Sequence, residues 1–346
     1  MTPLWKLSLL DHYDEQWRVL LPYIDEFHIA HWKGKAPENM PYQFHEVERR
    51  LSWWKRGHTL KWIVSISGMV AKLIKIPVEL YYTLSGYWIQ ELVNRLSKKT
   101  KKPYVVRLRG DHRESRNSAN INRIKKWYWN YHETRTLKEA DLIIPICEKL
   151  RQKAISWEVD PNIITEPVPL GVDPRLFKPM KPKYLADKFC LGYVGRLSPE
   201  KGIKEFLNFA RMTPELDFLV AGDRQTEVTF PGNVRYLGRV LKKDVPMMMN
   251  SCDIIALPSH TEGFPNVLLE AYACEKPVLL TPEAYPEETK LFGICAPVQQ
   301  WTEAVKELGT WDLKSLGRKA RAYVRDRYTW KHYVERMVTY LGRVAR

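Results

Sequence analysis

The chain alternates between two kinds of hydrophobic pattern. Short apolar runs rich in Val, Ile, Leu and Tyr are typical of buried strands, whereas apolar residues spaced three or four positions apart are typical of helices. In the first half, residues 87–102 have the helical spacing, with lysines in the last turn. The segments that fit a strand are 75–86, 103–110 and 140–150. Strands that alternate with helices predict a parallel sheet covered on both faces.

The same alternation resumes after a proline-rich stretch at residues 168–183, which we interpret as an interdomain linker. The strand-like segments that follow it are 188–196, 217–222, 233–240, 253–259 and 276–281. The predicted fold class is α/β, with one Rossmann-like domain over residues 1–180 and a second over 181–328. Open α/β sheets bind ligands at the carboxyl ends of their strands, so we expect the two domains to face each other across a cleft that holds the site.

Composition narrows the class of partner. The 346 residues carry 55 basic and 40 acidic side chains, a net charge of +15. Residues 1–180 hold 30 basic and 20 acidic residues, and residues 181–346 hold 25 and 20, so the excess is +10 in the first half and +5 in the second. This charge favours anionic partners, among which phosphates, acidic lipid surfaces and nucleic acid all stay open.

The cysteines and the most apolar segment indicate a cytoplasmic chain. The five cysteines are scattered and no pair has CxxC spacing, which argues against a disulfide framework or a zinc site. Residues 62–78 are interrupted by Lys72, Lys75 and Pro77, which makes them too short and too charged to span a bilayer. The first residues lack a basic region before a long apolar stretch, so we expect no signal peptide.

A basic loop, GRLSPEKG, follows the predicted strand at 188–196. Arg196 offers a planar fork and Lys201 a point charge, and both suit phosphate oxygens. The residues between them suit the start of a helix, where free backbone amides attract anions. The alternative is a basic turn in which Glu200 and Lys201 form a solvated ion pair.

The segment EGFPNVLLEA, residues 262–271, places two carboxylates beside an apolar helix. Asn266 and Glu270 are four residues apart and therefore share one face of that helix. Burying an unpaired carboxylate is costly, so Glu270 needs either a protein donor or a ligand hydroxyl. The amides at the helix start would face an anion at the same time. The alternative is a capped core helix in which Glu270 bonds to a nearby backbone group or arginine.

These motifs occur together in an order that resembles the GT-B glycosyltransferases of family 4. The resemblance covers about residues 168–337 and includes the family's E-x7-E pattern at Glu262 and Glu270. The matching segments are PLGVDPRLFKP (169–179), YVGRLSPEKGI (193–203), NVRYLGRV (233–240), CDIIALPSHTEGFPNVLLEAYACEKPVLLT (252–281) and RYTWKHYVERM (327–337). It implies an acceptor-binding first domain, a donor-binding second domain, and a C-terminal helix (329–346) that packs back on the first domain.

The resemblance also implies a role for each matching residue of the donor site. Arg196 and Lys201 match the basic pair that holds the donor diphosphate, and Glu270 matches the glutamate that binds the ribose hydroxyls. Glu262 matches the glutamate beside the donor sugar and is the first candidate catalytic residue. The loop whose amides face sugar and phosphate corresponds to Gly263, Phe264, Pro265 and Asn266. The loop beside the nucleobase corresponds to Arg239 and Val240.

The chain departs from the family pattern at several positions. Glu275 stands where members usually have Gly, and we expect it in the turn beyond the helix, away from the donor. The glycine-rich first loop of many members has no clear counterpart. Residues 6–17 offer Asp11 and His12 but no Gly, so the part that these two residues take in catalysis stays open.

A third departure concerns the catalytic side of the first domain. Many members carry His-Gly-x-Asp after a strand, where this chain has Arg109, Gly110, Asp111 and His112. We expect Asp111 and His112 to be further candidate catalytic residues, with Asp111 in contact with substrate. The alternative is that Asp111 caps the helix that follows.

The resemblance implies a retaining transfer from a nucleoside-diphosphate sugar, such as a UDP or GDP sugar, to an acceptor hydroxyl, and the choice among uridine, guanosine and adenosine as the base stays open. In this family the departing diphosphate helps to deprotonate the acceptor, so no dedicated base is needed. The chain contains no D-x-D motif, the metal site of the other main glycosyltransferase fold, so we expect no essential metal and no cofactor besides the sugar donor. The basic pair and the helix start would stabilise the leaving diphosphate instead.

Tryptophan is concentrated in the first half, where ten of the 13 lie before position 160, interleaved with Lys and Arg. Trp beside basic groups suits a membrane interface or sugar stacking, and residues 53–76 fit either a basic helix on lipid or a core-facing helix with a solvated side. An anionic acceptor site or a charged rim would use the cluster Arg107, Arg109, Arg113 and Arg116. Our hypothesis is a lipid-linked or membrane-surface glycan acceptor, with the protein peripheral on the cytoplasmic membrane face.

A second hypothesis is a non-catalytic basic α/β protein that binds nucleic acid or another polyanion. The charge supports it, but the chain has no RNP, KH or zinc-finger pattern, and this hypothesis gives Glu262 and Glu270 no role. A dehydrogenase is disfavoured because no G-x-G-x-x-G follows a strand. We therefore expect an enzyme with a nucleotide-sugar donor and no nucleic-acid partner.

Overall fold

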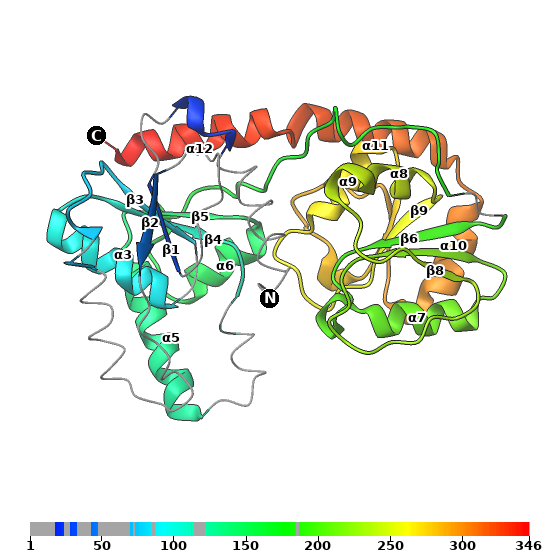
Figure 1. The fold of residues 1–346 in the computed structure, drawn as a ribbon, viewed down its shortest axis with the longest axis horizontal. Coiled ribbons are helices and arrows are strands. Elements are labelled where there is room, and N and C mark those ends of the chain that lie inside the picture. Colours follow the sequence, from blue (N-terminus) through cyan, green and yellow to red (C-terminus); the bar gives the residue numbers. More distant parts are fainter. Residues whose placement is uncertain are drawn as a thin grey trace. The chain divides into compact units, whose positions relative to one another are not determined.

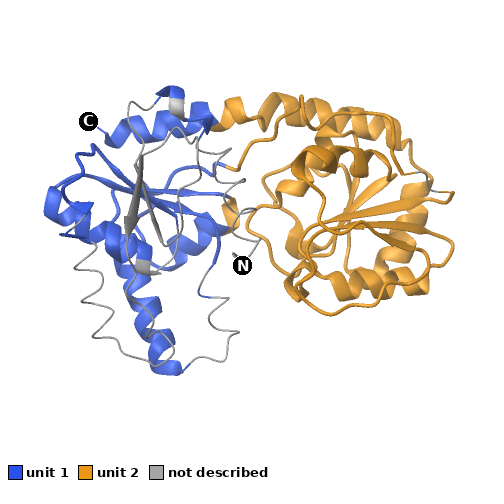
Figure 2. Cartoon of the chain, viewed as in Figure 1, with its two compact units in different colours: residues 1–146, 150–168, 334–346 blue, residues 147–149, 169–333 orange. Residues whose placement is uncertain are grey.

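A computed structural model describes residues 18–23, 28–32, 43–47, 70–71, 73–84, 87–111, 113, 122–184 and 187–345. The chain divides into two compact units (Figure 2). The first unit consists of residues 1–146, 150–168 and 334–346, and the second of residues 147–149 and 169–333. Domain boundaries at 180/181 and 328/329 stay predictions from the sequence.

The first unit holds a three-stranded parallel sheet, whose strands lie in the order β3-β4-β5 (Figure 1). Its strands are β3 (Tyr81–Leu84), β4 (Tyr104–Leu108) and β5 (Leu142–Pro145). All five residues of β4 are buried, as expected for the central strand of a sheet that is covered on both faces. A separate parallel pair is formed by β1 (His28–Trp32) and β2 (Gln43–Val47).

The helices of the first half follow their strands. They are α3 (Tyr87–Thr100), α5 (Arg123–Lys138) and α6 (Glu148–Ser156). The helix predicted over 87–102 is therefore confirmed as α3. The strand predicted over 140–150 is confirmed only to Pro145, because Glu148 already begins α6.

The second unit holds a six-stranded parallel sheet in the order β11-β10-β9-β6-β7-β8. Its strands are β6 (Cys190–Val194), β7 (Asp217–Ala221), β8 (Val234–Tyr236), β9 (Ile254–Leu257), β10 (Val278–Leu280) and β11 (Gly293–Cys295). From β6 the chain builds outward through β7 and β8, then returns to the other side of β6 for β9, β10 and β11. This is the doubly wound Rossmann order, and its switch point lies between β6 and β9.

Helices cover both faces of the second sheet. Apolar side chains of α7 and α10 pack against β6, β7 and β9 in one core cluster, while α8 and α9 lie over the other face (Figure 1). In that cluster Trp301 and Phe206 are fully buried and meet edge to face, with ring centroids 6.4 Å apart. The α-helices of this half are α7 (Ile203–Met212), α8 (Val245–Asn250), α9 (Asn266–Ala273), α10 (Trp301–Gly309), α11 (Leu313–Arg327) and α12 (Trp330–Val344).

Short 3-10 turns complete the described part of the chain. They are Leu21–Tyr23, Pro161–Ile163, Pro199–Lys201, Lys242–Asp244, Pro282–Ala284 and Val298–Gln300. The turn at Pro199–Lys201 lies in the basic loop GRLSPEKG, between β6 and α7. The residues of that loop are therefore held in a defined backbone conformation.

Candidate functional site

The switch point of the second sheet brings two predicted loops together. The basic loop 195–202 leaves the carboxyl end of β6, and the loop 258–265 leaves the carboxyl end of β9. β6 and β9 are hydrogen-bonded neighbours in the sheet. In open α/β sheets the ligand crevice lies at this point, where the connections from two adjacent strands run in opposite directions.

Gly202 holds the two loops against each other. Its backbone is left-handed, with φ of 67°, and a Cβ atom here would lie 1.9 Å from the carbonyl oxygen of Pro258. Only glycine allows this conformation and this approach together. The backbone amide of His260 adds a hydrogen bond of 3.0 Å to the carbonyl of Glu200. The end of the basic loop is therefore fixed on the end of β9.

Lys201 and Glu262 meet across the two loops. The Nζ atom of Lys201 lies 2.5 Å from Oε1 of Glu262, and the same oxygen accepts a hydrogen bond of 2.8 Å from the Ser259 hydroxyl. The side chain of Lys201 is 25% exposed and that of Glu262 is 14% exposed, so a ligand can reach both while water is partly excluded. Electrostatic interactions are strengthened in such an environment.

Tyr193 lies beneath this pair and supports the basic loop. Its hydroxyl donates to the carbonyl of Arg196 at 2.7 Å. Burial raises the pKa of Tyr193 above its ordinary value, and the nearby carboxylates of Glu262 and Glu200 raise it further. The phenol therefore stays protonated and acts as a donor to the loop backbone.

Arg196 lies at the open side of the site. Its guanidinium lies 3.3 Å from Glu200 and donates at 3.3 Å to the side-chain oxygen of Gln225. More than half of this side chain is exposed, so an anionic ligand can displace these partners. Arg196 and Lys201 come from one loop, and the structure brings Lys201, rather than Arg196, into contact with Glu262.

The ends of β7 and β8 continue the same edge of the sheet. The backbone of Leu197 pairs with that of Asp223 and Gln225, just beyond β7. Arg239, just beyond β8, lies with its Nε atom 3.9 Å from Oδ2 of Asp223, and Val240 follows it half-buried. The residues predicted to lie beside the nucleobase are thus linked through Asp223 to the basic loop.

Helix α9 begins directly after the second loop. Pro265 is its N-cap residue, and no side chain caps its first amides. Phe264 is 6% exposed, and its ring centroid lies 6.3 Å from that of Tyr328, so packing fixes the loop before the helix. An uncapped helix N-terminus that follows the switch point can bind an anion through its amides and its dipole. Gly263 and Asn266 are half-buried on either side of this turn.

Glu270 lies one turn into α9 and is half-buried. Its charge acts on the buried Cys274, four residues further on. Burial raises the pKa of the Cys274 thiol to about 12, and the Glu270 carboxylate is the next largest cause. Glu270 is therefore a half-buried carboxylate in the middle of α9, and its binding of ribose hydroxyls stays a prediction.

Glu275 lies beyond the C-terminus of α9, as expected. Its backbone is left-handed, with φ of 59°, a conformation that favours glycine after a helix. Its side chain lies 4.0 Å from the Nε atom of Arg321 on α11. The Glu at position 275, where the family usually has Gly, therefore strains the backbone of the turn after α9 and does not belong to the candidate site.

Asp111 has two partners within the first unit. Oδ1 accepts the backbone amide of Arg113 at 2.9 Å, and Oδ2 lies 2.6 Å from Nζ of Lys153. The first contact is a local bond from a backbone amide to the side chain two residues before it, and the helix that Asp111 was expected to cap lies, beyond Arg113, outside the described residues. A role for Asp111 in catalysis stays a prediction. His112, Asp11 and His12 lie outside the described residues, as do most of residues 53–76.

The arginine cluster of the first unit is largely structural. Arg107 is fully buried in β4 and donates to the carbonyls of Ile144, Pro145 and Val168. Arg113 lies with its guanidinium carbon 3.9 Å from the ring centroid of Trp157. Arg107 is therefore not an exposed anion site, because it faces the core, and Arg113 is half-buried. Arg109 is half-buried, and Arg116 lies outside the described residues.

Sequence reasoning missed Ser259 and Gln225. Ser259 is buried and donates to Glu262, and Gln225 binds both the side chain and the backbone of the basic loop. Both lie in loops that leave the carboxyl end of a strand, Ser259 after β9 and Gln225 after β7, which was the available signal. Within the described ranges, no group of three His, Cys, Asp or Glu residues is placed to hold a metal ion. No helix of those ranges is both long and apolar enough to cross a bilayer.

Residues 188–310 match the family model described as glycosyl transferases group 1. The chain is 28% identical over 211 residues to a GDP-mannose-dependent monoacylated alpha-(1-6)-phosphatidylinositol monomannoside mannosyltransferase of Corynebacterium glutamicum, covering 51% of this chain and 55% of that protein. It is 35% identical over 96 residues to an N,N'-diacetylbacillosaminyl-diphospho-undecaprenol alpha-1,3-N-acetylgalactosaminyltransferase of Campylobacter jejuni, covering 25% of each. The chain thus spans about half the length of the first relative and a quarter of the second.

Two solved structures resemble the fold over most of the chain. HepE of Anabaena, in complex with UDP and glucose, has a TM-score of 0.75 at 17% identity, with 95% of each chain covered. Sucrose-phosphate synthase from Thermosynechococcus elongatus has a TM-score of 0.73 at 17% identity, covering 95% of this chain and 91% of that one. At this identity the likeness shows the fold alone. The expected α/β fold of the GT-B class is confirmed.

Proposed function

Because residues 188–310 belong to the family of group 1 glycosyl transferases, we propose that the protein transfers a sugar from a UDP or GDP sugar to an acceptor hydroxyl. The observation that carries the proposal is the contact of Lys201 with Glu262 at the switch point, ahead of the uncapped start of α9. A cation, a carboxylate and the amides of a helix start at one place suit a diphosphate joined to a sugar. The relatives from C. glutamicum and C. jejuni are both glycosyltransferases by name.

Each residue of the proposed site has one task. Lys201 and Arg196 hold the diphosphate and stabilise the charge that develops on it as the sugar leaves. The backbone amides of Gly263, Phe264 and Asn266 share that charge, whereas Pro265 has no N–H to donate. Glu262 holds the sugar hydroxyls, and Glu270 holds the ribose. Arg239 and Val240 lie beside the base, where their backbone groups distinguish one nucleobase from another.

The proposed transfer retains the configuration at the anomeric carbon and needs no metal ion. The cations Lys201 and Arg196, with the start of α9, take the charge that a metal would otherwise neutralise. We predict that transfer from the preferred UDP or GDP sugar keeps its rate in the presence of EDTA, and that proton NMR shows the donor's configuration in the product. A loss of activity that Mg²⁺ or Mn²⁺ restores would overturn the metal-free assignment.

The proposed acceptor is a glycan linked to lipid or held at a membrane surface. The relatives from C. glutamicum and C. jejuni are named for acceptors on phosphatidylinositol and on a diphospho-undecaprenol. In this chain, helix α5 carries an exposed stripe in which Ile124, Trp127 and Tyr131 are 75%, 65% and 53% exposed. These positions share one helix face, and exposed basic residues lie beside them. Exposed aromatic side chains beside basic residues suit the interface of an anionic lipid membrane.

A liposome assay tests the membrane part of the proposal. The wild-type protein should sediment with phosphatidylglycerol vesicles and not with phosphatidylcholine vesicles. Trp127→Ser should reduce sedimentation several-fold, while Trp311→Ser, at a 37% exposed position of the second unit, should leave it unchanged. Equal sedimentation with both lipids, or equal effects of both variants, would refute a role for α5. A cytoplasmic location of the protein is part of the same proposal.

A further inference from the structure

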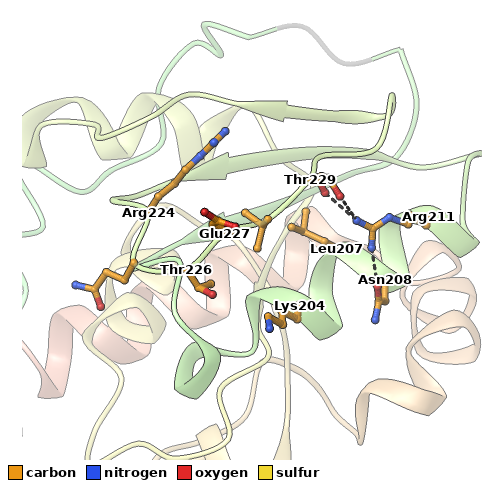
Figure 3. A pocket seen from close by; sticks show the side chains of 10 residues that line it. Lys204, Leu207, Asn208, Arg211, Arg224, Thr226, Glu227 and Thr229 are labelled. Carbon is orange, nitrogen blue, oxygen red and sulfur yellow. Dashed lines mark hydrogen bonds between the residues drawn. The ribbon is translucent and has the colours of Figure 1, made fainter.

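A second groove lies in the second unit, between helix α7 and residues 224–229. Its volume is about 890 Å³, within the range of small-molecule sites. Figure 3 shows side chains of α7 on one side of the groove and those of residues 224–229 on the other. None of the residues predicted for the donor site lines it. The groove is therefore separate from the candidate donor site, and a ligand bound in it would be distinct from the sugar donor.

One face of α7 supplies cations and an amide to the groove. Lys204, Asn208 and Arg211 are spaced four and three residues apart, so their side chains leave the same face of the helix. Lys204 is exposed and forms no ion pair within the ranges that the structure describes. Seven residues of helix rise about 10 Å, which separates the two cations by more than the size of a single phosphate.

Arg211 is held in position by the opposite side of the groove. Its guanidinium donates to the side chain of Asn208 at 2.6 Å, to the carbonyl of Thr229 at 2.8 Å and to the Thr229 hydroxyl at 2.9 Å. An arginine side chain has five N–H donors, and these contacts use one on Nη1 and both on Nη2. The Nε donor and the second Nη1 donor are left for an anion, on a guanidinium whose position is already fixed.

Arg224 adds a third cation to the groove, and its guanidinium contacts two aromatic rings nearby. The rings of Phe230 and Tyr236 are stacked, with centroids 4.6 Å apart. The guanidinium carbon of Arg224 lies 4.8 Å from the first centroid and 4.7 Å from the second. Neither ring is among the residues that line the groove, so the groove itself has no aromatic surface for stacking with a nucleobase. Among the lining residues there is one carboxylate, that of Glu227, against three cations.

We propose that this groove binds an acidic glycan, a chain of sugar rings that carries carboxylate or phosphate groups at intervals. Separated cations on α7 suit an extended ligand with more than one anionic group. Asn208, Thr226 and Gln225 provide amide and hydroxyl groups for sugar hydroxyls. Single-stranded nucleic acid usually needs aromatic platforms, and the groove offers none that is free.

The proposal goes beyond the proposed glycosyl transfer, because binding of a glycan in the groove does not depend on transfer activity. Binding can therefore be measured without any sugar donor. The two places are nevertheless neighbours, since Gln225 lines the groove and its side chain also accepts a hydrogen bond from Arg196. An acidic glycan held in the groove would lie beside the open side of the candidate donor site.

Isothermal titration of the full-length protein with a galacturonate tetrasaccharide tests the groove. The wild-type protein should bind it, and should bind neither neutral maltotetraose nor inorganic phosphate to a comparable extent. The double variant Lys204→Ala/Arg211→Ala should weaken binding about tenfold or more, because it removes charge-assisted contacts. Glu227→Gln should strengthen binding, since it removes the carboxylate from the groove.

A matched control separates the groove from general charge attraction. Arg318→Ala/Lys319→Ala removes the same charge from exposed positions on α11 and should leave the dissociation constant within about twofold, since exposed charges at a distance are screened. Several results would overturn the proposal: no binding by the wild-type protein, equal weakening by both double variants, or equal binding of maltotetraose. Tighter binding of a dT oligonucleotide that depends on Lys204 and Arg211 would assign the groove to nucleic acid instead.

Discussion

Without a ligand, the cation and the carboxylate of the candidate site neutralise each other. Lys201 lies 2.5 Å from Glu262, and Ser259 donates to the same oxygen. A diphosphate that binds Lys201 must therefore compete with Glu262, or share the cation with it. A sugar beside the diphosphate would then meet a carboxylate that has been released from its ion pair.

The variant Glu262→Gln tests this competition. It keeps the shape of the side chain but removes the charge that Lys201 faces, so UDP or GDP should bind several-fold more tightly. Sugar transfer should fall about a hundredfold, because the carboxylate beside the sugar is lost. Calorimetry and a coupled assay measure the two effects. The exposed Glu307→Gln on α10 is the control, and weaker nucleotide binding by Glu262→Gln would argue against the competition.

Glu275 gives a second test at a single residue. A residue with a side chain is about 1–2 kcal/mol less stable than glycine in the left-handed region. Glycine offsets part of this advantage, because it loses more conformational entropy when the chain folds. Glu275→Gly should therefore raise the free energy of unfolding by about 0.5–1 kcal/mol in urea titrations. Glu275→Ala keeps the Cβ atom and loses only the carboxylate near Arg321, so it should give no gain. Equal stability of all three proteins would mean that the turn carries no strain.

At the scale of elements, the site depends on how the loops after β6 and β9 meet. The sequence indicated β6, β9 and the loops that follow them, and the strands that it predicted in both halves are confirmed with shorter ends. It did not indicate the strand order. That order follows from chain crossovers, which a local hydrophobic pattern does not record. The contact between Gly202 and Pro258 is a consequence of this order and could not be read from either loop alone.

The variant Gly202→Ala tests the contact between the loops. A Cβ atom would clash with the Pro258 carbonyl and would also be strained at a φ of 67°. The free energy of unfolding should fall by about 2 kcal/mol or more, and nucleotide binding should weaken with it, because the end of the basic loop must move. Gly232→Ala is the control, since nothing lies within 4 Å of a Cβ atom there. Unchanged nucleotide binding by Gly202→Ala would show that Lys201 does not need this support.

Local pattern also failed for short or unusual elements. β11 has three residues, Gly293–Cys295, which is too short for a periodic signal. Arg107 belongs to a strand whose other residues are apolar, and sequence reasoning placed it in an exposed basic cluster. The structure buries it, because the carbonyls of Ile144, Pro145 and Val168 accept its hydrogen bonds. Such partners come from distant parts of the chain and have no signature in the residues beside Arg107.

At the scale of the whole molecule, the two halves differ in how much of their function the sequence predicts. The second half carries motifs whose spacing fixes a site, and residues 188–310 match a family model. The first half diverges in sequence and holds most of the positive charge and of the tryptophans. The sequence therefore predicts a donor site in the second half, whereas it leaves the acceptor open, because the first half resembles the family only loosely.

The central claim is that the carboxyl ends of β6 and β9 bind a nucleoside diphosphate through Lys201. Calorimetric titration of UDP and of GDP into the wild-type protein, Lys201→Ala and the exposed control Lys306→Ala tests it most directly. One of the two nucleotides should bind the wild-type protein and Lys306→Ala equally. Lys201→Ala should bind the same nucleotide about tenfold or more weakly, while its free energy of unfolding stays close to that of the wild-type protein. Binding that is unaffected by Lys201→Ala, or no binding of either nucleotide to the wild-type protein, would contradict the account.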